Sequence, residues 1–101
     1  AFVTRSEMEA SFLLVLDETN RLLKEAYEKA GLIDDEHALA QAGLKDGSTI
    51  VMDYLHHNEA GVAFDHLMYM INEALLSLSP ASQRVLERIE VQLGSTLSNG
   101  Q

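Results

Sequence analysis

The residues best suited to chemistry are the histidines and carboxylates between positions 53 and 66. Asp53 and His56 are three residues apart, as are His56 and Glu59, so each pair would lie one turn apart on a helix. A zinc or iron site needs three or four such ligands that converge from facing elements. The sequence has no His-Glu-x-x-His motif, and the adjacent His56 and His57 would point about 100° apart on a helix. We therefore interpret these side chains as structural or solvated and expect no metal ligands among them.

Other catalytic chemistry has no motif in this sequence. The chain has no Cys, no Gly-x-Ser-x-Gly, no P-loop and no dinucleotide-binding fingerprint. Its many carboxylates could serve general acid–base catalysis only in a pocket that shifts their pKa values. The sequence Asp46–Gly47–Ser48 is typical of a turn followed by a helix cap. We expect no catalytic residues, no cofactor and no enzymatic activity.

Charge is the most informative part of the composition. Sixteen acidic residues against seven basic ones give a net charge of −9, and the excess is uneven. Residues 31–73 hold eight carboxylates against Lys45 alone, a net charge of −7, whereas the charges of residues 74–101 cancel. Such a chain repels nucleic-acid backbones and anionic membranes and attracts cationic proteins. Without Cys or an apolar run of about 20 residues, we expect a cytoplasmic protein with no membrane or nucleic-acid partner.

The spacing of apolar residues predicts a long first helix. Ser6 and Glu9 have the spacing of a capping box, which marks a helix start. An apolar stripe with helical period follows and ends at Gly31, a residue type common just after a helix. We therefore expect a helix over residues 6–30.

Four further helices are expected after the first. A short one is predicted over residues 34–42, and Ser48 is expected to cap the next. Residues 64–78 carry apolar side chains at the i, i+3, i+4, i+7 spacing of an amphipathic helix. A final helix is expected to begin at Pro80, which follows a capping Ser, and to end at Gly94.

These elements predict an all-α protein with a single domain. Hydrophobic residues make up 47% of the chain, and it has only one Pro and short connections throughout. The expected architecture is a compact bundle of about five helices over residues 1–94. Residues 95–101 are polar, and we expect them to form a frayed tail.

Residues 51–67 resemble small bacterial toxin-immunity proteins, in particular the Maf-type group and those of contact-dependent growth inhibition systems. The shared pattern is an apolar helix, a polar corner with Asn or Gly and Glu, and a Gly-apolar-Ala step into a helix with acids and Leu. Here the corner is Asn58–Glu59–Ala60–Gly61, and Val62–Ala63–Phe64–Asp65 follows it. The likeness extends to the acid-bearing Asn72–Glu73 in the following helix, so it covers roughly a quarter of the chain.

The resemblance implies a non-enzymatic protein that docks on a secreted toxin domain and blocks its active site. Many toxins of such systems are nucleases with basic clefts, so the expected partner is a cationic RNase. An acidic helical face would then mimic the phosphate chain. The charge distribution fits this expectation independently, and an exposed aromatic outside the core stripe would add an anchor. The expected contact residues are Asp53, His57, Glu59, Asp65, Tyr69 and Glu73, with Asp34, Asp35 and Glu36 as a secondary patch.

Two alternatives stay open at the level of sequence. The leading one is an acidic helical adaptor or regulator that binds some other basic protein. A weaker one is a metal-dependent helical enzyme built on the histidines described above.

We expect no metal to be required for folding, because no complete set of His and carboxylate ligands is visible. Protein purified without chelator should retain no stoichiometric zinc, iron or manganese after dialysis, as measured by elemental analysis. A chelator should leave its melting temperature unchanged. A bound metal that survives dialysis and raises the melting temperature would contradict this interpretation.

Overall fold

The fold is seen in a computed structural model that describes residues 4–30 and 47–99. These ranges form four helices and no strand, which confirms the all-α class. The helices are α1 (Arg5–Ala30), α3 (Gly47–His56), α4 (Ala60–Glu73) and α5 (Pro80–Asn99). The short helix predicted over residues 34–42 lies outside the described ranges, as do Asp34, Asp35 and Glu36.

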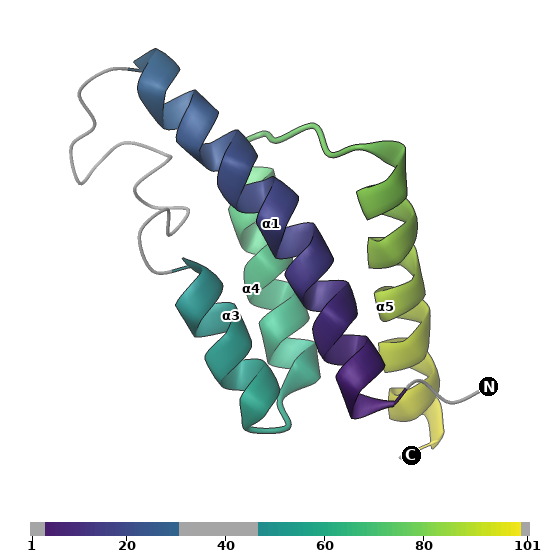
Figure 1. Cartoon of the computed structure of the whole chain (residues 1–101). Coiled ribbons are helices and arrows are strands. Elements are labelled where there is room, and N and C mark those ends of the chain that lie inside the picture. Colours follow the sequence, from purple (N-terminus) through teal and green to yellow (C-terminus); the bar gives the residue numbers. More distant parts are fainter. Residues whose placement is uncertain (1–3, 31–46, 100–101) are drawn as a thin grey trace.

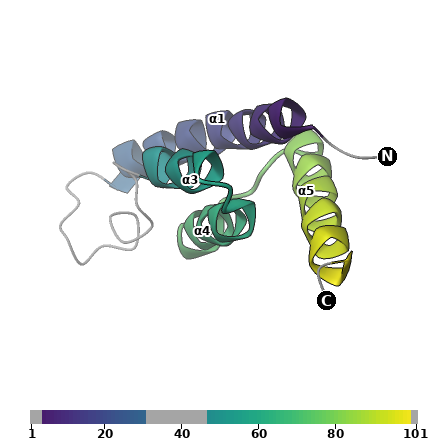
Figure 2. The same cartoon turned by 90° about the horizontal axis from the view of Figure 1, so that it is seen from below.

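The helices are arranged around the long helix α1 (Figure 1). α3 and α4 form an antiparallel hairpin, and α3 packs against α1. α5 contacts both α1 and α4, and it crosses α1 at a wide angle rather than running beside it (Figure 2). With 26 residues, α1 is ~39 Å long at 1.5 Å per residue. It is therefore long enough to serve as a common support for the hairpin and for α5.

The start of α1 differs from the predicted capping box. The helix begins at Arg5, so Thr4 takes the capping position in place of Ser6. Thr4 Oγ1 accepts a hydrogen bond from the Glu7 backbone N–H at 3.0 Å and donates one to Glu7 Oε1 at 3.2 Å. Thr4 and Glu7 have the same three-residue spacing as Ser6 and Glu9. The predicted capping motif is therefore of the right type, but it was placed two residues too far along the chain.

The corner between α3 and α4 depends on a left-handed residue. Asn58 has a φ of 62°, and Glu59 N–H donates to the Tyr54 carbonyl at 2.9 Å while Asn58 N–H donates to Leu55 at 3.2 Å. This is the hydrogen-bond pattern of a Schellman motif. Asn tolerates left-handed backbone better than most residues, so Asn58 suits this position of the corner. Gly61, the last residue of the expected corner, lies in the first turn of α4 instead.

The end of α4 uses the same motif with a less suitable residue. Leu76 N–H donates to the Ile71 carbonyl at 3.0 Å, and Leu75 has a φ of 53°. The predicted helix over residues 64–78 therefore ends early, at Glu73. Leu75 is 87% exposed, so its assignment to the inward stripe is wrong. Leu78 is buried as predicted, but it lies in the connection to α5 rather than in the helix.

The limits of α5 and α3 also refine the predictions. α5 begins at Pro80 as predicted, but it runs past Gly94 to Asn99. Gly inside a helix costs only ~1 kcal/mol relative to Ala, which a helix of this length tolerates. The described part of α3 runs from Gly47, so the predicted cap Ser48 lies within the helix. Gly47 is buried against Met70, and a Cβ at this position would lie 2.7 Å from the Met70 sulfur, so the two helices approach closely here.

The core is formed where the apolar stripes of all four helices meet. Within the described ranges, Phe12 and Val15 of α1 are fully buried, as are Val51 of α3 and Leu67 of α4, and α5 contributes Ile89 at 2% exposure. Each of these residues lies on a stripe that the sequence predicted. The stripes therefore direct the remaining faces of the hairpin and of α5 outward.

Truncation of the α4 stripe should destabilise the fold strongly. Leu67 is fully buried, so Leu67→Ala is expected to lower the free energy of unfolding by ~2–5 kcal/mol. Val91 is 64% exposed on α5, and Val91→Ala should stay within about 0.5 kcal/mol of the wild type. Chemical denaturation followed by circular dichroism measures both. Equal effects of the two substitutions would show that the assigned core is wrong.

Candidate functional site

All six predicted contact residues that fall in the described ranges lie on the α3–α4 hairpin and are exposed. We call this surface the hairpin face. It consists of Asp53, His57, Glu59, Asp65, Tyr69 and Glu73.

Helix geometry gathers these residues on the outward side of each helix. On α4, Asp65, Tyr69 and Glu73 follow one another at intervals of four residues, so they form one stripe. This stripe is opposite the buried side chain of Leu67. Asp53 of α3 and His57, the first residue after that helix, are also four residues apart. The two stripes belong to neighbouring helices of one hairpin, and Glu59 precedes the first turn of α4 between them.

The hairpin face has only one sign of fixed charge. Residues 47–73 contain four carboxylates and no Lys or Arg. The His57 ring lies beside Asp53, with its Nδ1 3.6 Å from Asp53 Oδ1 and 2.7 Å from the Asp53 carbonyl oxygen. Both side chains are about 70% exposed, so the pair contributes little to stability. The carboxylates are therefore accessible to a partner of opposite charge.

Tyr69 is the exposed aromatic of this face. Its side chain is 42% exposed, and its ring centroid lies 6.0 Å from that of His66, within the usual range for aromatic pairs. His66 is half-buried, and its Nε2 is a buried atom with no hydrogen-bond partner in the described part of the chain. The sequence places His66 among the histidines considered as metal ligands. In the structure its ring lies beside that of Tyr69.

His56 points away from the hairpin face, towards α1. Its Nε2 is 3.5 Å from Glu9 Oε1, and Arg5 Nη2 donates a hydrogen bond to its carbonyl oxygen at 3.1 Å. The adjacent histidines thus face different surroundings, as helix geometry predicted. Within residues 4–30 and 47–99, no group of three His, Asp or Glu side chains is arranged to hold a metal ion.

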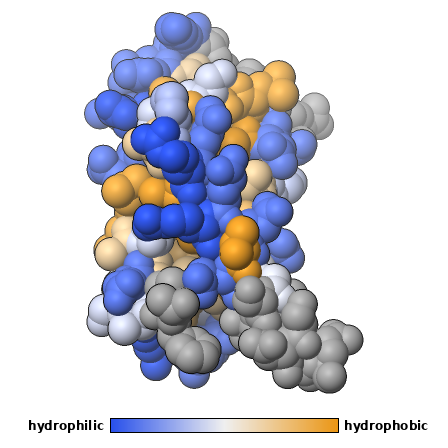
Figure 3. Space-filling model, turned by 90° about the vertical axis from the view of Figure 1, so that its right-hand side faces the viewer, coloured by the Kyte–Doolittle hydropathy of each residue, from blue (hydrophilic) through white to orange (hydrophobic). Residues whose placement is uncertain are grey.

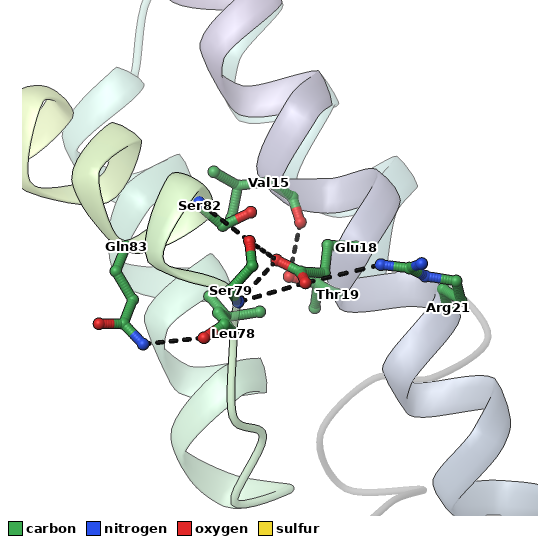
Figure 4. A network of polar contacts seen from close by, with 8 residues as sticks. All are labelled: Val15, Glu18, Thr19, Arg21, Leu78, Ser79, Ser82 and Gln83. Carbon is green, nitrogen blue, oxygen red and sulfur yellow. Dashed lines mark hydrogen bonds and ion pairs between the residues drawn. The ribbon is translucent and has the colours of Figure 1, made fainter.

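A second polar cluster joins α1 to the start of α5 (Figure 4). The Glu18 carboxylate accepts hydrogen bonds from Ser79 N–H at 3.1 Å and from Ser79 Oγ at 2.9 Å, and Arg21 lies 3.5 Å away. Ser79 Oγ in turn accepts a hydrogen bond from Ser82 N–H at 3.2 Å, which caps α5. The helix dipole adds to the attraction, since a carboxylate is favourable at a helix N-terminus.

This environment changes the acidity of Glu18. Hydrogen bonding from Ser82 lowers the pKa of Glu18 below its ordinary value, and the Ser79 hydrogen bonds and Arg21 lower it further, while burial opposes them. The Glu18 side chain is only 14% exposed. Its partners are Arg21 of α1 and the Ser79 and Ser82 groups at the start of α5. We therefore interpret Glu18 as a structural carboxylate rather than a catalytic base.

Several exposed apolar side chains were missed by the sequence analysis. Val62, on the outward side of α4, is 44% exposed, and Leu75 follows that helix. Leu13 and Leu14 are about half exposed on α1. Val62 precedes Tyr69 by seven residues, and this helical spacing was the signal that could have identified it.

The α5 side of the molecule has a different character. Figure 3 shows this side, where hydrophilic side chains run down the middle and smaller hydrophobic patches lie at the margins. The charged residues of α5 balance, with two carboxylates and two arginines, which are Arg84, Glu87, Arg88 and Glu90. The acidic excess of the described helices is thus concentrated elsewhere, on the hairpin and α1.

Comparisons with known protein families, with characterised proteins and with solved structures find no match for this chain. None of the described helices is both long and apolar enough to cross a bilayer. Function is therefore inferred from the residues themselves.

Removing the Glu18 charge should make stability less dependent on acid pH. Because the pKa of Glu18 is lowered by folding, its contribution is complete above the ordinary value of about 4.5 and is lost as pH falls through the folded value. Glu18→Gln should therefore cost ~1.5–3 kcal/mol at pH 7, as for hydrogen bonds to a charged group, and less at an acidic pH below the folded-state pKa of Glu18. Denaturant unfolding at both pH values measures this. The exposed Glu25→Gln variant is the control, and an equal loss for Glu18→Gln at both pH values would contradict the assignment.

Proposed function

We propose that this chain is an immunity protein that acts in the cytoplasm and neutralises a cationic toxin, an RNase, by covering its active site with the hairpin face. The observation that carries the proposal is the charge of residues 47–73. Four carboxylates lie there on exposed positions, and no Lys or Arg neutralises them. The resemblance to toxin-immunity proteins falls on residues 51–67, which belong to this same hairpin.

An RNase active site must attract a polyanion, so its cleft is positively charged. A row of carboxylates on a rigid helix offers that cleft the same sign of charge as a phosphate chain. Asp65 and Glu73 lie eight residues apart on α4, which separates them by ~12 Å along the helix axis at 1.5 Å per residue. Their helix is held by a fully buried stripe, so little conformational entropy is lost when the partner binds.

Charge of this kind acts mainly on the rate of association. Complementary potentials raise association from ~10⁵–10⁶ M⁻¹s⁻¹ towards ~10⁸ M⁻¹s⁻¹ at low salt. An antidote benefits from such speed, because the toxin must be bound before it cuts cellular RNA. Tyr69 offers an aromatic ring and His57 an imidazole ring on the same face. Tyr residues are frequent anchors in protein interfaces.

The test combines Asp53→Lys, Glu59→Lys, Asp65→Lys and Glu73→Lys in one variant. The candidate partner to test is the product of the gene directly before this one, because an immunity gene is expected to follow its toxin gene. We expect the wild-type chain to bind it, to inhibit its RNase activity and to protect cells that produce it. The quadruple variant should associate at least ~100-fold more slowly and should not protect, because repulsion replaces steering.

A matched control separates the hairpin face from total charge. Glu25→Lys, Glu28→Lys, Glu87→Lys and Glu90→Lys change the net charge by the same amount at exposed positions of α1 and α5. This control should still inhibit the RNase, and both variants should remain helical by circular dichroism. Full protection by the folded hairpin variant would contradict the proposal. Binding of the basic protein without inhibition would favour an adaptor instead.

A further inference from the structure

The outward side of α4 carries apolar residues among its carboxylates. Val62 is 44% exposed and Tyr69 is 42% exposed, and their spacing of seven residues places them two turns apart on one side of the helix. Asp65 lies between them in sequence, and Glu73 follows one turn after Tyr69. This side of α4 is therefore amphipathic in its own right, although the buried stripe is on the opposite side.

Leu75 extends the apolar positions beyond the end of α4. It is 87% exposed, so its side chain gains almost nothing from burial in this chain. Its φ of 53° costs roughly 1–2 kcal/mol for a residue with a Cβ, a penalty that Gly would avoid. The packing role at this helix end belongs to Leu76, which is half-buried against the core. Folding alone thus gives no reason for Leu at position 75.

Charge indicates what would cover these residues. Because no Lys or Arg lies between positions 47 and 73, a partner that places apolar side chains on α4 also meets uncompensated carboxylates. A neutral apolar segment would bring no positive charge to Asp65 and Glu73, and a second copy of this chain would bring a net charge of −9. A segment with alternating apolar and basic side chains satisfies both features.

We propose that Val62, Tyr69 and Leu75 are apolar anchors for an amphipathic basic segment of a partner protein, whose Lys or Arg side chains pair with Asp65 and Glu73. The inference rests on the proposed function for the positive charge of the partner. It adds that affinity depends on the apolar contacts of Val62, Tyr69 and Leu75. Blocking of the cleft by charge alone would not require them. Apolar anchors act on dissociation, whereas exposed charges act on association.

The test uses the whole chain and synthetic peptides, so it does not depend on any toxin. The probe is a helical peptide of about 18 residues with Leu at i, i+3, i+4, i+7 spacing and Lys elsewhere, long enough to form a helix. One comparison peptide has Ser in place of Leu, and another has Glu in place of Lys. Titrations followed by NMR of the ¹⁵N-labelled chain give the affinity and locate the contact.

We expect the Leu–Lys peptide to shift resonances of α4 and Leu75 and to bind at least ~10-fold more tightly than either comparison peptide, a difference equal to one decade in Kd. Leu75→Gly should weaken binding about tenfold while it raises the melting temperature, because Gly relieves the left-handed strain. Loss of binding in a more stable protein excludes misfolding as the cause. The matched control is Val91→Gln, which removes an apolar side chain that is 64% exposed on α5 and should leave binding unchanged.

Three outcomes would overturn the inference. They are equal affinity for the Ser–Lys peptide, contact at α5 or at Leu13 and Leu14 instead of α4, and undiminished binding by Leu75→Gly. None of them involves RNase inhibition or cell protection, so failure here is distinguishable from failure of the proposed function.

Discussion

The contact between Glu18 and Ser79 is the interaction on which the arrangement of the other helices depends. It joins residues that are 61 positions apart and ties the middle of α1 to the first residue before α5. One carboxylate thereby satisfies a backbone donor and a hydroxyl at a helix end, where unpaired donors would otherwise be left. The connection from α4 must arrive at this point, so the contact also sets where α4 ends relative to α1. α5 crosses α1 at a wide angle and is joined to it at this end (Figure 2).

Local chemistry explains why the helices and their buried stripes could be predicted from the sequence. The period of apolar residues correctly assigned Phe12, Val51, Leu67 and Ile89 to the core, because a helix buries one stripe whatever it packs against. Helix ends were less predictable. Thr4 caps α1 instead of Ser6. Two Ser/Thr-x-x-Glu motifs overlap here, and the sequence alone does not distinguish them. Leu75 broke the apolar stripe because a left-handed Leu has no signature in sequence.

The candidate site was predictable in part for a similar reason. Exposure of the carboxylates follows from their positions opposite the α4 and α3 stripes, so sequence alone could place them on the outside. The partner of Glu18 could not be found, because a contact across 61 residues needs the packing of α1 against α5. Helix geometry already separated His56 from His57, but the contact of His56 with Glu9 depends on the packing of α3 against α1. Val62 was not predicted as part of the site, because one exposed Val indicates a contact surface only when its neighbours on the helix are known.

Because Gly47 lies close to Met70, oxidation of Met70 would report on the separation of α3 from α4. Met70 is fully buried, and its sulfur lies against the first residue of α3, so peroxide can reach it only when the two helices part. Oxidation to the sulfoxide adds a polar oxygen for which this contact has no space. Met8, Met52 and Met68 are only partly buried and would react without such opening. The order in which the four methionines oxidise would therefore follow local unfolding of the hairpin, independently of any binding partner.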